Sequence, residues 1–519
     1  MAGIIQRAAA ALFLCATVQV LPASGADRDL LIRGARVIDP ESGLNAVRDV
    51  AVNDGRIVAI DERLPPGDGV SVDAATRVID ATGRVLAPGF IDLHAHGASD
   101  KAREYQVRDG VTTALELEWG YPAVGAFLES RRGRSRVNFG ASVSHGALRA
   151  LVLGAGEQRE ELRQRMVQAV QQPEPLLALQ GLTGDSFYAP LDAARRKEVA
   201  AEVRRGIQEG GLGIGMAHAY YPGADRGEIL EVFEAAAALQ IPIYTHARGR
   251  GLDAVQEVLA NAAATGASLH IVHINSTTLG EVEPALRLIR SAQLRGVDVT
   301  TEAYPYTAAS TLIQSSLFDG DWQSAYGISY DGLQWQATGE RLTEQSFNEY
   351  RRQGGVLIIH MMRDAWIDDA LGNDWVMVAS DGMPYDPGAH PRTAGTFARV
   401  LGHYVRERGL IDLPTAIRKM TLLPARRLEP VAPQMASKGR VQVGMDADLV
   451  LFDPRRVIDT ATFEGGPSYS EGIEFVFVGG VAVVDSGELV PDAYPGEAIR
   501  GQLPDAAPGG DMHIGPTER

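Results

Sequence analysis

The stretch Phe90-Ile91-Asp92-Leu93-His94-Ala95-His96 joins a short apolar run to two histidines one residue apart. Side chains repeat every two residues along a strand, so a strand here places both imidazoles on one face. Three more polar residues directly follow similar runs: His246 after Ile243-Tyr244-Thr245, His273 after Leu269 to Val272, and Asp381 after Val376 to Ser380. All five therefore stand at the carboxyl ends of predicted strands.

Around these residues, positions 88–430 alternate strand-like and helix-like segments. The strand-like runs are 176–179, 241–245, 269–272, 297–301 and 376–379, and the amphipathic stretches between them include 195–209, 228–239 and 252–265. This alternation predicts an α/β fold, a TIM-like (β/α)8 barrel, whose active sites lie where the carboxyl ends of the strands converge. A doubly wound open sheet is the alternative, but no G-x-G-x-x-G loop opens one.

The convergence of these side chains predicts a metal site. Neutral imidazole is a common ligand of zinc and related divalent ions. A single strand histidine is more often a hydrogen-bonded core residue, but four histidines and an aspartate at strand ends point to a shared cation.

Both ends of the chain differ from the middle. Residues 30–39 and 49–60 contain alternating β-branched segments with Asp54-Gly55 between two of them, typical of a hairpin. Residues 448–452 and 475–484 form similar short segments. We therefore expect residues 27–87 and 431–500 to build one small β-sandwich domain, and residues 501–519 to form a disordered tail.

Composition sets the broad class. The chain has 519 residues, of which 45% are hydrophobic and 22% are charged, as in soluble proteins with a large core. Lys and Arg number 49 against 66 Asp and Glu, a net charge of -17, which gives no electrostatic footprint for nucleic acid. Nothing in the sequence indicates the number of subunits.

The first 26 residues have the parts of a secretory signal peptide. Arg7 is followed by an apolar run from Ala8 to Leu21 and by Ala23-Ser24-Gly25-Ala26. The run is shorter than the roughly 20 residues that span a bilayer, so we expect cleavage after Ala26, export to the periplasm or medium, and no stable membrane span. The only cysteine is Cys15, so the mature chain offers no thiolate ligand.

Several stretches carry a family resemblance. Val85-Leu86-Ala87-Pro88-Gly89-Phe90 through His96 resembles the first barrel strand of the amidohydrolase superfamily. Four other stretches resemble one family of this superfamily, the D-aminoacylase (N-acyl-D-amino-acid deacylase) family. They are Gly211-Leu212-Gly213 through Tyr220-Tyr221-Pro222-Gly223, Tyr304-Pro305-Tyr306-Thr307-Ala308-Ala309-Ser310-Thr311, Ser380-Asp381-Gly382, and His390-Pro391-Arg392-Thr393-Ala394-Gly395-Thr396-Phe397. The likeness runs from about Leu30 to Arg500.

The resemblance implies a metal-dependent hydrolase of amide bonds other than ordinary peptide bonds. In such an enzyme His94, His96, His246 and His273, with Asp381, would hold one or two divalent ions, zinc by preference. Asp381 would also serve as general base and acid. The substrate would be a small amide with a carboxylate, an N-acyl (D-)amino acid or a D-residue dipeptide. The substrate-binding positions carry over as Tyr220, Asn275, Tyr304, Ser310 and Arg392.

The sequence departs from the family at two of these places. The family has a cysteine ligand on its second strand, but residues 110–120 contain none and instead carry Glu116 and Glu118. Burying a carboxylate in an apolar strand is costly unless it is paired or coordinated. Glu118, nearer the rim, is the predicted replacement ligand, with Glu116 as the alternative. Asn275 stands where the family has a lysine.

Two other functions remain open from the sequence. A cyclic amidase of the hydantoinase or dihydroorotase type would carry a lysine on a mid-barrel strand, and 176–179 has none. A catalytically inactive binding barrel would have lost metal ligands, which here are retained. We further expect residues 318–355 to form a lid or loop over the rim.

Overall fold

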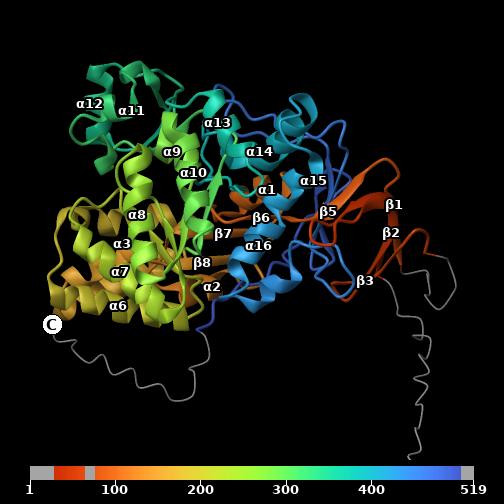
Figure 1. Ribbon diagram of the computed structural model, residues 1–519, viewed down its shortest axis with the longest axis horizontal. Coiled ribbons are helices and arrows are strands. Elements are labelled where there is room, and N and C mark those ends of the chain that lie inside the picture. The colour runs from red at the N-terminus through yellow and green to blue at the C-terminus, as the bar shows by residue number, and fades with distance from the viewer. Residues whose placement is uncertain (1–28, 65–75, 504–519) are drawn as a thin grey trace, which may run out of the picture.

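The computed structural model describes residues 29–64 and 76–503 (Figure 1). The predicted signal peptide with Cys15 lies outside these residues, as do positions 504–519 of the predicted tail. Within the described ranges, no helix combines the length and apolar character needed to cross a bilayer.

Eight parallel strands form a nearly closed barrel, which confirms the predicted architecture. In sheet order they run β6 (Phe90–Asp92), β7 (Val111–Tyr121), β8 (Asn138–Ser144), β9 (Ile214–Met216), β10 (Pro242–Thr245), β11 (Ser268–Ile271), β12 (Val299–Ala303) and β16 (Met377–Val378). The helices are α1 (Asp100–Arg108), α2 (Val124–Arg131), α3 (His145–Leu153), α4 (Gly156–Val170), α5 (Pro175–Thr183), α6 (Ala193–Gln208), α7 (Arg226–Leu239), α8 (Gly251–Thr265), α9 (Ile274–Thr278), α10 (Val282–Gln293), α11 (Trp322–Tyr326), α12 (Glu344–Gln353), α13 (Asp364–Leu371), α14 (Arg392–Arg399), α15 (Leu413–Met420) and α16 (Leu422–Leu428). The amphipathic stretches expected to be helical correspond to α6, α7 and α8.

One expected strand is wrong. Residues 176–179 lie in helix α5, whose first residue is Pro175, and not on a barrel strand. A short apolar run has the same periodicity signal in a buried strand and in a buried helix, and proline at the first helical position favours the helix.

The barrel closes through a side chain between its first and last strands. Asp92, at the end of β6, accepts hydrogen bonds from the backbone N–H of Ser380 at 3.0 Å and from its hydroxyl at 2.5 Å. The backbone N–H of His96 then donates to the carbonyl of Gly382 at 2.8 Å. The segments that carry the His-x-His pair and Asp381 are therefore held together.

Replacing Asp92 with alanine should lower the free energy of unfolding by about 3 kcal/mol or more. Three donors, including the backbone N–H of His94, would lose a buried acceptor, and each unmet buried donor costs about 1–3 kcal/mol. Denaturant unfolding measures the effect, and Ser380→Ala, which removes one of the three donors to Asp92 and the acceptor of the Gly382 N–H, should cost less. An unchanged unfolding midpoint for Asp92→Ala would rule out this closure.

Between β12 and β16 the chain leaves the barrel. It forms the antiparallel strands β13 (Ala309–Leu312), β14 (Leu333–Trp335) and β15 (Val356–Ile359) and the helices α11 and α12, which stand at the upper left of Figure 1. This excursion contains the segment expected to be a lid. Phe318, Trp322 and Phe347 pack against one another inside it.

The two chain ends share one nine-stranded sheet. It contains β1 (Leu30–Ile38), β2 (Asn45–Asn53), β3 (Arg56–Asp61), β4 (Arg77–Asp80) and β5 (Val85–Pro88), joined through β5 to β17 (Leu449–Phe452), β18 (Ile473–Val478), β19 (Val481–Asp485) and β20 (Glu488–Leu489). Asp54 and Gly55, with φ of 47° and 72°, make the expected tight turn. Along β17, Leu449 and Leu451 join the core of this small domain while Val450 and Phe452 join the barrel core, as a period of two requires.

Candidate metal centre

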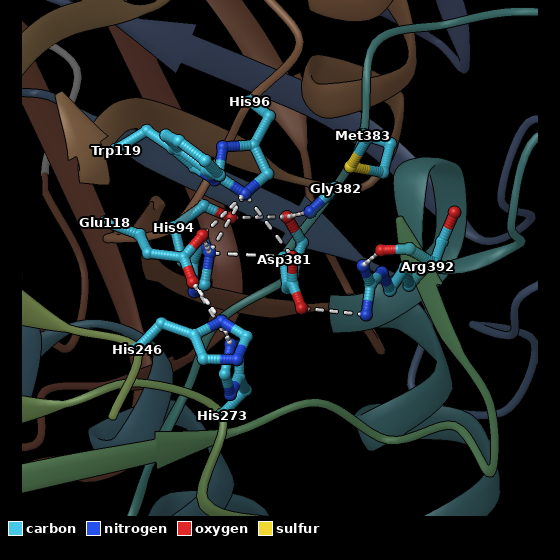
Figure 2. Close-up of polar contacts among 12 residues, drawn as sticks. His94, His96, Glu118, Trp119, His246, His273, Asp381, Gly382, Met383 and Arg392 are labelled. Atoms are coloured by element: carbon cyan, nitrogen blue, oxygen red, sulfur yellow. Dashed lines mark hydrogen bonds and ion pairs between the residues drawn. The ribbon is translucent and has the colours of Figure 1, made fainter. Parts of the chain in front are cut away.

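The structure brings the predicted metal ligands together at the carboxyl ends of the barrel strands (Figure 2). His94 and His96 follow β6, Glu118 lies near the end of β7, and Asp381 follows β16. His246 directly follows β10, and His273 lies two residues after β11. All six side chains are nearly inaccessible to solvent.

Glu118 lies between two pairs of histidines. Its Oε2 atom is 3.1 Å from His94 Nε2 and 3.2 Å from His96 Nε2. Its Oε1 atom is 2.8 Å from His246 Nδ1 and 3.2 Å from His273 Nε2. Each carboxylate oxygen thus faces one pair of imidazoles, and each pair with Glu118 could hold an ion.

Further carboxylates fix the tautomers of the first pair. His94 Nδ1 lies 2.6 Å from Glu302 Oε1, and His96 Nδ1 lies 2.7 Å from Glu116 Oε2. Because a carboxylate accepts, each Nδ1 carries the hydrogen and each Nε2 is left with a lone pair. The two Nε2 atoms are 3.1 Å apart. In the neutral imidazoles both lone pairs point to the same place beside Glu118, and this donor set fits a divalent metal.

No carboxylate of the described residues lies behind the second pair, His246 and His273. His273 Nδ1 lies 3.1 Å from the Thr277 hydroxyl. His246 Nε2 is buried without a hydrogen-bond partner among the described residues. The negative charge of the centre is therefore concentrated around the His-x-His pair.

The pKa shifts agree with an electronegative centre. Burial alone would lower the pKa of His94, but the charges of Asp381, Glu118 and Glu302 outweigh it and raise the pKa well above its usual value. Burial likewise opposes ionisation of Glu302, while His94 and His270 reverse that effect and hold its pKa at about 2. Carboxylates that stay ionised in a buried site attract a cation.

Asp381 is held in a strained backbone conformation. Its φ is 49°, in the left-handed region that non-glycine residues seldom adopt and that often marks functional sites. Its Oδ1 atom lies 3.5 Å from His94 Nε2 and 3.4 Å from His96 Nε2, while Oδ2 lies 2.8 Å from Arg392 Nη1. Burial would raise the pKa of Asp381, but Arg392 and His94 lower it, so the carboxylate is ionised.

A cavity of about 510 Å³ opens on the centre, and only some of the predicted substrate-binding residues line it. Tyr220 and Ser310 line it, whereas Asn275, Tyr304 and Arg392 are buried and do not. Arg392 lies over the Tyr304 ring at 4.6 Å and donates to the Ser310 carbonyl at 3.3 Å. The Tyr304 and Ser310 hydroxyls and Arg392 Nε have no hydrogen-bond partner among the described residues. Of these residues Arg392 contacts Asp381, and the Ser310 hydroxyl on the cavity wall suits a carboxylate.

The excursion meets the cavity through its two ends. Lining side chains come from residues 309–312 and 314–317 and from Ile359, not from 318–355. The residues that line the cavity therefore lie before and after the segment 318–355 that was expected to form a lid. The ends of the excursion form the wall, and its helices pack behind them.

Sequence reasoning missed Glu302 and gave His270 no role. Glu302 Oε2 lies 3.0 Å from His270 Nε2, so this buried pair supports His94 from below. The available signal was an acidic residue in the mostly buried strand β12, much as the acidic residue Glu118 stood out in β7.

Replacing Glu302 with glutamine should weaken metal binding about 10–100-fold, the usual cost of losing an outer-shell partner of a histidine ligand. Competition with a chromophoric chelator measures the affinity. The matched control is Glu474→Gln, which removes a carboxylate paired with Arg84 in the small domain. Equal affinity in Glu302→Gln and wild type would contradict the supporting role.

A barrel with histidines and carboxylates converging at its rim is the architecture of a metal-dependent hydrolase. The amidohydrolase family matches residues 77–484, and the chain belongs to this family. It is 30% identical over 510 residues to an N-acyl-D-glutamate deacylase of Alcaligenes xylosoxydans xylosoxydans, covering 91% of this chain and 96% of the relative. A D-aminoacylase of the same organism is 32% identical over 493 residues, covering 88% and 94%.

Solved structures agree with this assignment. An N-acyl-D-glutamate deacylase from Bordetella bronchiseptica, complexed with zinc and a phosphonate inhibitor, matches with a TM-score of 0.74 and 26% identity over 92% of this chain and all of that one. A D-hydantoinase from Thermus sp. reaches 0.58 at 18% identity, covering 91% and 99%, which supports the fold alone. The predicted metal-dependent amidohydrolase is thus confirmed.

Proposed function

We propose that the protein is a zinc-dependent deacylase of N-acyl-D-amino acids or D-residue dipeptides. The observation that carries the proposal is the position of Glu118 between two histidine pairs, beside an ionised Asp381 and a cavity large enough for such a substrate. The names of the relatives support the D-amino acid, and zinc in one solved relative supports the metal.

Zinc held by the four histidines and Glu118 would supply a Lewis acid and an activated water. Asp381 takes the proton from the attacking water at Oδ1 and passes it to the leaving nitrogen, which cannot depart as an anion. Arg392 holds Oδ2, which fixes the direction in which Oδ1 points. Ser310, which lines the cavity, offers a hydrogen-bond donor for the substrate carboxylate, and the buried Arg392 behind it adds positive charge.

The other candidate functions have less support. A cyclic amidase would need its bridging lysine, but none of the eight described barrel strands contains a lysine. An inactive binding barrel would have no use for a complete ligand set held by buried carboxylates. Glu118 takes the bridging place between the histidine pairs.

The test is a substrate screen on metal-loaded protein. N-acetyl and N-formyl amino acids and dipeptides, in both the D and L series, should show hydrolysis in the D series, with zinc measured by elemental analysis. Turnover of hydantoins or dihydropyrimidines alone would favour the cyclic amidase. No turnover at full metal occupancy would favour the inactive barrel.

Export is a separate part of the proposal. It rests on the signal-peptide pattern of residues 1–26. The mass of the mature protein from a periplasmic fraction should correspond to a chain beginning at Asp27. Intact Met1 in a cytoplasmic fraction would contradict it.

A further inference from the structure

Arg250 lies on the cavity wall, in a loop whose course depends on two glycines. It lies between β10 and α8, four residues after His246, and is flanked by Gly249 and Gly251 with φ of 80° and 72°. A Cβ atom on Gly251 would lie 2.1 Å from Glu281 Oε2. The loop therefore requires glycine at these positions, and its fixed course directs Arg250 to the rim.

Arg250 is the only lysine or arginine among the described residues that line the cavity. Its guanidinium donates to the Tyr326 hydroxyl at 2.9 Å and to the Gly249 carbonyl at 3.1 Å, and lies 4.8 Å from the Tyr326 ring centre. Its Nε is buried without a partner, and no carboxylate in the described part of the chain forms an ion pair with it.

Two other arginines, unlike Arg250, are paired with carboxylates. Arg248 Nη2 lies 3.3 Å from Glu257, and Arg392 Nη1 lies 2.8 Å from Asp381. Arg392 is also fully buried, so the exposed positive charge of the cavity comes from Arg250. A half-buried guanidinium with free donors is a ready partner for a carboxylate, which it can bind through two parallel hydrogen bonds.

We propose that Arg250 binds a second carboxylate of the substrate, so that the preferred substrates are N-acyl derivatives of acidic amino acids. The inference rests on the proposed deacylase function. Arg392 contacts Asp381 after β16, whereas Arg250 follows the ligand His246 after β10, so the two cations belong to different sectors of the rim. One carboxylate of a dicarboxylate substrate meets Ser310, behind which the buried Arg392 lies, and the side-chain carboxylate meets Arg250.

The experiment compares N-acetyl-D-glutamate with N-acetyl-D-glutamine, which have nearly the same shape and differ in side-chain charge. Wild type should favour the glutamate substrate about 10–100-fold in kcat/KM, the worth of a hydrogen-bonded charge pair. Arg250→Gln should lose this preference through a higher KM for the glutamate substrate, with the glutamine substrate nearly unaffected. Arg250→Lys should restore part of the preference.

Tyr326→Phe is the matched control, because it removes the hydroxyl that Arg250 contacts and keeps the guanidinium and the ring. Its preference should equal that of wild type. The inference is overturned if wild type does not favour the glutamate substrate, or if Arg250→Gln impairs both substrates equally. If metal-loaded wild type hydrolyses no N-acyl amino acid, the deacylase proposal fails. Calorimetric binding of the same two compounds to wild type and Arg250→Gln then decides the role of Arg250.

Discussion

Replacing Asp381 with asparagine should lower kcat about 10²–10⁴-fold while the protein keeps its metal, because a general base and acid contributes a factor of this size. Asparagine has nearly the shape of aspartate but cannot take a proton from water at neutral pH. Both roles proposed for Asp381, proton acceptor and proton donor, would therefore be lost together. Initial rates on the best substrate from the screen, with elemental analysis of the same sample, measure the effect.

Asp386→Asn serves as the control, since Asp386 is an exposed carboxylate five residues further along the same loop. Its activity should match wild type. Full activity in Asp381→Asn would remove Asp381 from the chemistry. Parallel loss of metal and activity would make it first of all a ligand.

Replacing Glu118 with alanine should reduce bound metal to background and abolish activity. Glu118 is within 3.2 Å of all four histidines predicted as ligands, so its loss removes a donor from both halves of the centre at once. It also removes the negative charge that offsets the charge of the cation. Elemental analysis after dialysis against a weak chelator gives the metal content.

Glu116→Ala separates the two glutamates of β7. Glu116 contacts His96 at Nδ1, on the side away from the cavity, so its loss should weaken metal binding about 10–100-fold without preventing it at saturating metal. Glu118→Cys keeps an anionic ligand in place and should retain metal. Unchanged metal content in Glu118→Ala would reject Glu118 as a ligand.

The sequence predicted the barrel and the meeting of the site residues because both depend on local patterns. An apolar run followed by a histidine marks a strand end, and the barrel gathers such ends whatever the loops between them do. Outer partners such as Glu302 depend on which strands are neighbours and on how far each side chain reaches. That information is absent from a pattern along one segment.

The misplaced strand has the same origin. Residues 176–179 are apolar and bounded by a proline. Whether they form a helix depends on their packing beside α3 and α4, which only the folded chain defines. The pairing of Arg392 with Asp381 was also hidden, because the two residues are eleven positions apart and meet through a loop.

The Asp92–Ser380 contact has a consequence for how the protein loses its ion. His94 and His96 follow the first strand of the barrel, beside this contact, and Glu118, His246 and His273 lie on other strands, so a cation held by these residues would tie the first strand to the rest of the barrel. Ligands that bind only the native state raise its stability in proportion to the logarithm of their concentration. Release of the ion and the first opening of the barrel should therefore occur together. On heating, excess zinc should raise the temperature of both by the same amount.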